Sequence, residues 1–264
     1  MFASNPFAEL ATLIPPTATQ AYVVLMFVLV VGGTVLDMIH KKSAKYFFEN
    51  AKKAKATRER ELGAGEMTGI AVRTVAEDVL TSAEFCNPRR RISHLFTMYG
   101  FVLFLVTTIA LVFGYPTHAS PAPAILAQLW HLGALMVCFG GYWFWFFIRV
   151  DVAAEGNPWY RLVRADLFIL SLLGTTTFGL IWAFLQTQGY GFWTGVFLGL
   201  FIIASTVLFG GVMWSKFAHM FFKPAAAFQK RVIMADGSRD NLPMPTDEPA
   251  QFGLGIKREL PRHY

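Results

Sequence analysis

The sequence predicts an all-α integral membrane protein, a five-helix bundle with its N-terminus outside the cell and its C-terminus in the cytoplasm. Of the 264 residues, 55% are hydrophobic and 26 are Phe, a composition too apolar for a soluble domain of this length. Each of five apolar runs is close to the roughly 20 residues that cross a bilayer as a helix. Lipid offers the backbone no hydrogen-bond partner, so each run is expected to be helical. The spans are expected at about 18–36, 94–115, 125–148, 165–185 and 192–214.

The basic residues predict the orientation of these spans. All 23 Lys and Arg fall into three groups, with 12 in 41–91, 3 in 149–164 and 8 in 216–262. Short basic loops stay in the cytoplasm, so these three segments are expected on the cytoplasmic side of a bacterial inner membrane. Trp159 and Tyr160 fall near inner ends of spans, which is typical of interfacial aromatic belts. The basic balance is therefore a signal of topology and not of nucleic-acid binding.

The polar mass is expected on the cytoplasmic side. A five-span membrane domain should cover 1–223, with a helical cytoplasmic insertion at 41–93 and an extended cytoplasmic tail at 224–264. Residues 37–60 lack Gly and Pro and should continue the first helix as a basic stalk. The apolar spacing in 66–83 predicts a short amphipathic helix, which packs either on lipid headgroups or on a soluble partner.

The tail has five prolines and little apolar periodicity, so it cannot form a core alone. It is either disordered or an arm that orders on a partner. Phe252, Leu254 and Ile256 are its apolar anchors and the candidate partner-binding residues.

His94 and His219 are the candidate haem-binding residues. His94 opens the second run and His219 follows the fifth, and the two runs cross the membrane in opposite directions. Both imidazoles are therefore expected at one depth near the cytoplasmic interface. Two helices can hold a b-type haem between two such axial ligands. The alternative is a pair of interfacial histidines bonded to water or headgroups.

Other residues are candidates for a second haem or for a quinone site. His131 lies near the outer end of the third run, but no second span histidine shares its depth. His40, at the inner end of the first run, could be a ligand or proton relay or simply an interfacial residue. Lys216 and Trp145 complete this set. Trp145 belongs to the aromatic stretch 142–147, whose rings either wall a haem or quinone pocket or pack on lipid.

Two charge couples flank the short loop between the third and fourth runs. Arg149 is expected to pair with Asp151, and Arg164 with Asp166. Pairing would anchor the helix ends at the interface without leaving a lone charge in hydrocarbon.

Two histidine motifs resemble a known family. The stretch 91–101 (RISHLFTMYGF) is similar to the start of a span, and 214–222 (WSKFAHMFF) to the end of the fifth span, in the gamma-subunit family of respiratory nitrate reductases and membrane subunits of heterodisulfide reductases. Within that group, 149–156 (RVDVAAEG) and the Pro-rich C-terminus look most like the membrane anchors of dissimilatory adenylylsulfate reductases from sulfur oxidisers. The resemblance covers roughly 37–264.

The resemblance implies a b-type cytochrome-like subunit that transfers electrons between a cytoplasmic iron–sulfur flavoenzyme and membrane quinone. The soluble partner would be the alpha and beta subunits of adenylylsulfate reductase, and His94 and His219 would be axial ligands of one haem b. The nitrate reductase type has two further ligands, but 101–108 and 201–206 hold no histidine here. This departure implies a reduced or lost haem complement.

The residues leave two other function classes open. One is a haem-free scaffold that tethers the soluble enzyme to the membrane. The other is a small transporter, against which the lack of internal repeats and of mid-span charges weighs. The chain has no glycine-rich phosphate loop and no flavin or nucleotide motif, so it is expected to perform no substrate chemistry of its own.

Overall fold

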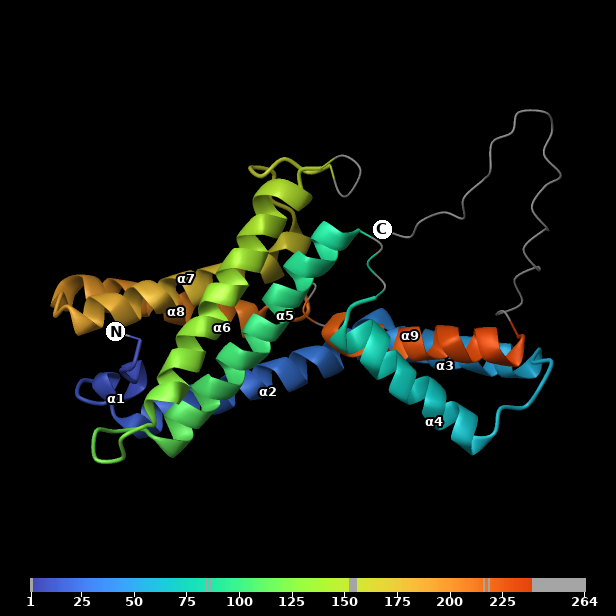
Figure 1. Ribbon diagram of the computed structural model, residues 1–264, viewed down its shortest axis with the longest axis horizontal. Coiled ribbons are helices and arrows are strands. Elements are labelled where there is room, and N and C mark those ends of the chain that lie inside the picture. The colour runs from blue at the N-terminus through green and yellow to red at the C-terminus, as the bar shows by residue number, and fades with distance from the viewer. Residues whose placement is uncertain are drawn as a thin grey trace. The chain divides into compact units, whose positions relative to one another are not determined.

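The computed structural model describes residues 2–83, 85, 87–151, 156–215, 217 and 219–238, except for the side chains of Lys41, Ser43 and His219. Within these residues every regular element is a helix, which confirms the all-α prediction (Figure 1). The chain forms two compact units. The bundle unit comprises Met1–Leu36 and Ile92–Ala218, and the second unit comprises Asp37–Arg91 and His219–Tyr264.

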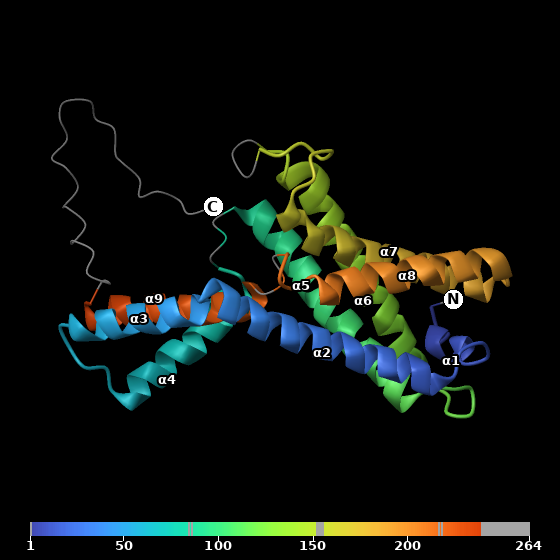
Figure 2. The same cartoon turned by 180° about the vertical axis from the view of Figure 1, so that it is seen from behind.

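Five helical segments are long and apolar enough to cross a membrane, which confirms a multi-pass membrane protein. These segments are Pro16–His40, Pro88–Gly114, Ala124–Ile148, Arg164–Thr187 and Gly191–Gly210. The elements that form the bundle unit, or run into it, are α1 (Pro6–Leu10), α2 (Pro16–Lys41), α5 (Pro88–Ile109) with the π-helical η2 (Ala110–Gly114), α6 (Ala124–Trp143) with the π-helical η3 (Phe144–Ile148), the 3-10 turn η4 (Arg164–Asp166), α7 (Leu167–Thr187) and α8 (Gly191–Gly210). Helices α7 and α8 run side by side in both views (Figures 1 and 2).

Helices α5 and α6 approach each other closely through small residues. A Cβ added at Gly140 would lie 2.5 Å from the Ser93 carbonyl oxygen, and one at Gly133 would lie 2.6 Å from the Phe104 amide nitrogen. The Ser93 hydroxyl donates to the Gly140 carbonyl at 2.8 Å. In lipid, where helices gain little from hydrophobic association, such contact and interhelical hydrogen bonding hold spans together.

Aromatic rings fill the end of the bundle unit that α1 covers. Phe7 lies edge-on between Trp130 and Trp182, with ring centroids 5.9 and 5.7 Å away. Trp182 stacks on Phe201 at 5.6 Å, and the Trp130 indole donates to the Thr108 hydroxyl at 2.9 Å. These rings are well packed and, for Trp130, hydrogen-bonded, so they fix helices α5 to α8 relative to one another.

The fifth span ends earlier than the sequence predicted. Helix α8 stops at Gly210, whereas the apolar run continues to Trp214. The Gly211 amide still donates to the Val207 carbonyl, but a Cβ at Gly211 would lie 2.5 Å from that oxygen. The two consecutive glycines let the chain leave the helix here, a break that hydropathy alone does not reveal.

The second unit contains three further helices and one π-helical segment. They are α3 (Ser43–Ala56), α4 (Ala64–Arg73), η1 (Thr74–Leu80) and α9 (His219–Asp236). The predicted amphipathic helix at 66–83 is observed as α4 and η1. The predicted continuous stalk at 37–60 is wrong, because Lys42 has a φ of 53° in the left-handed region and separates α2 from α3.

The C-terminal tail also begins later than predicted. Residues 224–236 are helical, because α9 continues through Pro224 to Asp236. Pro224 falls in the second turn of α9, and the good helix formers that follow it, beginning with Ala225, sustain the helix. The remainder of the predicted tail lies outside the described residues.

Ion pairs join the elements of the second unit. The Arg231 guanidinium of α9 contacts Asp78 at 2.7 and 3.0 Å and Glu77 at 2.7 Å, both on η1. The hydrogen bond from Arg231 is the main reason why the pKa of the Glu77 carboxyl is lowered. The Asp236 carbonyl accepts from the Glu59 amide at 2.9 Å, which ties the end of α9 to the segment after α3.

Candidate functional site

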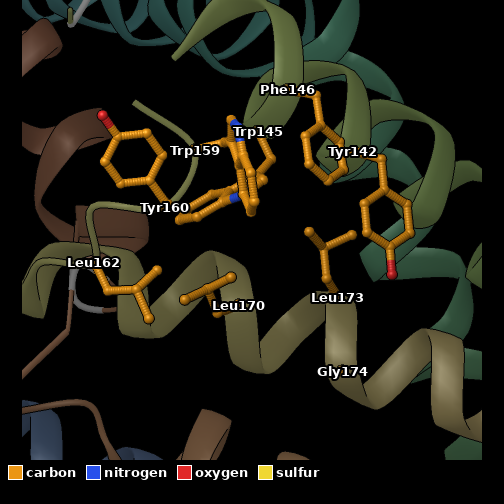
Figure 3. Close-up of a pocket in the computed structure, with 9 residues that line it drawn as sticks. All are labelled: Tyr142, Trp145, Phe146, Trp159, Tyr160, Leu162, Leu170, Leu173 and Gly174. Carbon is orange, nitrogen blue, oxygen red and sulfur yellow. The ribbon is translucent and has the colours of Figure 1, made fainter. Parts of the chain in front are cut away.

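An aromatic pocket lies in the bundle unit, where η3 ends and α7 begins. Its cavity volume is about 560 Å³, within the roughly 300–1,000 Å³ typical of small-molecule sites. Its walls come from α6 with η3, from the loop that follows, and from α7. The lining residues are Tyr142, Trp145, Phe146, Trp159, Tyr160, Leu162, Leu170, Leu173 and Gly174. Figure 3 shows the three leucines facing the aromatic rings.

The loop wall of this pocket is held by Arg149, whose side chain is 0% exposed. Its Nε and Nη2 donate to Asp166 at 3.2 and 2.5 Å. Its Nη1 donates to the carbonyls of Asn157 and Pro158 at 3.1 and 2.7 Å, and Nη2 also donates to the Arg161 carbonyl at 2.6 Å. A guanidinium has five N–H groups, so every donor of Arg149 is used. Because three of the acceptors are loop carbonyls, this one side chain fixes the loop that carries Trp159 and Tyr160.

The predicted charge couples at this loop are therefore wrong. The carboxylate that Arg149 contacts is that of Asp166 and not that of Asp151, and Arg149 is buried and not an interfacial anchor. Asp166 also accepts from the Val163 amide at 2.9 Å, while Arg164 is exposed. The pairing depends on the loop folding back over η3, which local sequence spacing cannot indicate.

Trp145 lies under the Arg149 guanidinium. The Arg149 Cζ atom is 4.3 Å from the centre of the Trp145 ring, a close cation–π contact. Trp145 is 4% exposed, and its indole N–H has no acceptor among the residues that the structure describes. The sequence left open whether the rings of 142–147 wall a pocket or pack on lipid, and in the structure Trp145 lines a pocket.

Hydroxyl and thiol groups continue from the pocket along the interface between α6 and α7. The Tyr142 hydroxyl is 2.9 Å from the Thr177 hydroxyl. The Cys138 sulfur is 3.5 Å from the hydroxyls of both Thr177 and Thr176. Cys138 therefore lies in a polar seam next to the pocket.

His94 lies on α5 and is half-buried. Its neighbour Ser93 faces α6, and Phe101, two turns further along the same face as His94, contacts Phe209 of α8 with ring centroids 6.4 Å apart. His94 is thus on the side of α5 that faces α8. His219 is the first residue of α9 in the second unit, and its side chain is not among those that the structure describes. The two histidines belong to different units, so the equal depth and the pairing of their imidazoles stay predictions.

His131 is buried at the α1 end of the bundle unit and does not line the pocket. Its Nδ1 is 2.7 Å from the Ala127 carbonyl, so this nitrogen is assigned the proton, and the buried Nε2 has no hydrogen-bond partner. Metal-binding histidines often show this arrangement. However, the rings of Phe2 and Trp130 pack on the imidazole at 5.1 and 4.9 Å. A second haem would have to displace one of these rings, so the residues present do not fit it.

The other predicted site residues are not brought to the pocket. His40 is exposed on α2. Lys216 and the tail residues Phe252, Leu254 and Ile256 lie outside the described residues.

The sequence missed the pocket residues outside 142–147, among them two aromatic residues of the loop. Trp159 and Tyr160 were assigned to an interfacial belt, yet both line the pocket. Their position in the sequence could have indicated this. They follow Asn157 and Pro158 directly, in a short loop that connects the end of one span to the start of the next.

Comparison with protein-family models, curated proteins and solved structures finds no match for this chain. The family resemblance consequently stays a prediction that rests on the two histidine motifs.

Proposed function

We propose that the protein is the membrane anchor and quinone-interacting electron-transfer subunit of an oxidoreductase complex. It would couple a cytoplasmic iron–sulfur flavoenzyme, of the adenylylsulfate reductase type, to the quinone pool of a bacterial inner membrane. The basic-residue partition supports N-out, C-in insertion with the pocket near the cytoplasmic leaflet.

The observation that carries the proposal is the pocket at the junction of η3 and α7. A quinone headgroup is flat, apolar on its faces and polar only at its carbonyl oxygens. The pocket offers aromatic and leucine walls together with indole and phenol groups from Trp145 and Tyr142. Its walls on α6, η3 and α7 belong to candidate spans, so a lipid-soluble ligand can reach it from the bilayer.

Haem b is the cofactor that the histidine motifs imply. When bound, it would supply one-electron transfer between the soluble enzyme and the quinone. His94 would provide one axial ligand, which agrees with its half-buried place on the α8-facing side of α5. His219 would provide the other.

The second unit supports a docking role. Among its described residues, Ala54 and Ala227 are the only buried hydrophobics. Large apolar side chains on α3, α4, η1 and α9 are exposed. They include Tyr46, Phe48, Val72, Val75 and Met234. A unit that buries so little of its own apolar surface is suited to cover it with a partner.

A visible spectrum tests the cytochrome part of the proposal. Purified protein, produced with ample haem, should show a reduced-minus-oxidised b-type spectrum. His94→Ala and His219→Ala should each abolish it, whereas His118→Ala, which alters an exposed histidine 3.4 Å from Glu9, should leave it intact. A wild-type protein with no Soret band would refute the cytochrome and favour the haem-free scaffold.

A binding measurement tests the quinone part separately. Wild-type protein in detergent should bind a ubiquinone or menaquinone analogue, and pocket variants such as Leu173→Trp should block it. Binding that is unchanged by filling the pocket would place the quinone elsewhere.

A further inference from the structure

Trp145 supplies the pocket with a hydrogen-bond donor that the described residues leave without a partner. The Trp145 side chain is 4% exposed, and its Nε1–H has no acceptor among the described residues. This nitrogen is not among the enclosed polar atoms without a partner, unlike the indole nitrogen of Trp182, so it is open to an acceptor that comes from outside the protein. Trp145 stands among the lining residues of the pocket in Figure 3, so an acceptor can reach it from the pocket.

The position of this indole is fixed from behind. Arg149 lies against its ring at 4.3 Å and spends all five of its own donors on the loop and on Asp166. Arg149 therefore has no N–H left for a ligand. Its contribution to the pocket is to hold the indole and the loop in place.

The guanidinium also changes the indole as a donor. A positive charge over the ring draws electron density from it, which makes the N–H a stronger donor. A stronger N–H donor favours an acceptor oxygen that gains negative charge. The carbonyl oxygen of a quinone gains such charge when the quinone accepts electrons.

We propose that the indole N–H of Trp145 is the hydrogen-bond donor to a carbonyl oxygen of the bound quinone, with Arg149 as the positioning residue. This inference rests on the proposed function and adds the residue that orients the ligand. Tyr142 is a less suitable donor to the ligand, because its hydroxyl already lies 2.9 Å from the Thr177 hydroxyl.

A matched pair of ligands tests the donor. Duroquinone and durene share one carbon skeleton, and only duroquinone has carbonyl oxygens. Their dissociation constants are measured by equilibrium dialysis against the full chain in micelles of one composition. Trp145→Phe keeps an aromatic ring but removes the N–H. It should weaken duroquinone about tenfold, the factor of a well-formed hydrogen bond, and leave durene within about twofold.

Trp159→Phe is the control, because Trp159 lines the same pocket but is exposed, and none of the described cations lies over its ring. It should leave both ligands within about twofold. A second measurement follows the indole proton resonance of Trp145, identified by its loss in Trp145→Phe. This resonance should move downfield with duroquinone and not with durene.

The outcomes separate the two proposals. If Trp145→Phe weakens both ligands equally, or leaves the preference for duroquinone intact, Trp145 is not the donor, although the quinone site stands. If the wild-type protein binds neither ligand, the quinone pocket itself is refuted.

Discussion

Different interactions stabilise each of the two units of the chain. The bundle unit buries large side chains, including Trp130 and Trp182, and its helices touch through glycines such as Gly140. The second unit buries only alanines among its described hydrophobics and joins α9 to η1 through Arg231. Packing of apolar rings changes little with pH or salt. Partly exposed ion pairs weaken when salt screens the charges or when a low pH protonates the carboxylate. The bundle unit should therefore be the rigid part, and the second unit the part that responds to its surroundings.

The largest loss of stability is expected at Arg149, where the largely apolar interior of the bundle unit contains a buried charge. Arg149→Ala would leave the Asp166 carboxylate and three loop carbonyls without their donor. Breaking a buried pair in this way typically costs about 3–5 kcal/mol. The free energy of unfolding should be measured by denaturant titration in detergent. Arg164→Ala, on the exposed part of the same loop, should stay within about 0.5 kcal/mol of wild type. Equal midpoints for both variants would show that Arg149 does not hold the loop.

The next effect tests the glycine contact between spans. In Gly140→Ala the new methyl group would lie 2.5 Å from the Ser93 carbonyl and 2.6 Å from the Thr97 hydroxyl, so α5 and α6 must separate. Overpacking of this kind costs about 1–3 kcal/mol. Gly32→Ala on α2 is the control, since nothing lies within 4 Å of its added Cβ. A Gly140→Ala protein that melts at the temperature of the Gly32→Ala protein would argue against close packing here.

A smaller effect is expected in the second unit. Arg231→Gln removes the contacts to Asp78 and Glu77, and because the arginine is partly exposed the loss should be about 1 kcal/mol. Amide hydrogen exchange should show it as faster exchange in η1 and α9, with the bundle unit unchanged. Arg73→Gln breaks a more exposed pair with Glu77 and should change the exchange of η1 less than Arg231→Gln does. Faster exchange throughout the bundle unit would mean that the two units are not independent.

The smallest effect is a pH dependence confined to the second unit. The pKa of the Glu77 carboxyl is lowered from its ordinary value of 4.5, first by the hydrogen bond from Arg231 and then by that from Arg73. A carboxyl with a depressed pKa stabilises the fold above its unfolded pKa, and this contribution is lost as the pH falls through the folded value. Protection of η1, corrected for intrinsic exchange rates, should thus be constant above pH 4.5 and decline below it. Glu77→Gln should flatten that decline.

The sequence predicted the five spans and the amphipathic helix because both depend on local periodicity and length. It failed where a single residue changes the backbone, as at Lys42 and Gly211, since hydropathy does not register such breaks. It also failed where a contact depends on how a loop folds back. Arg149 and Asp166 are far apart in sequence, and nearer partners were available to each.

The candidate site was predicted in part for the same reasons. Trp145 was found because it belongs to a dense aromatic stretch, whereas Trp159 and Tyr160 reach the pocket only through the loop that Arg149 fixes. The proposed haem pair of His94 and His219 was inferred from motifs, and the break after α8 shows that a continuous apolar run does not guarantee a continuous helix.

The placement of the pocket walls within candidate spans has a consequence for how affinity is understood. A ligand that enters from the bilayer is present there at its partitioned concentration, which for an isoprenoid quinone far exceeds its concentration in water. Weak intrinsic binding is then sufficient for high occupancy, and adding lipid or detergent dilutes the ligand without changing the site. Dissociation constants for this pocket therefore have meaning only as mole fractions in the membrane phase.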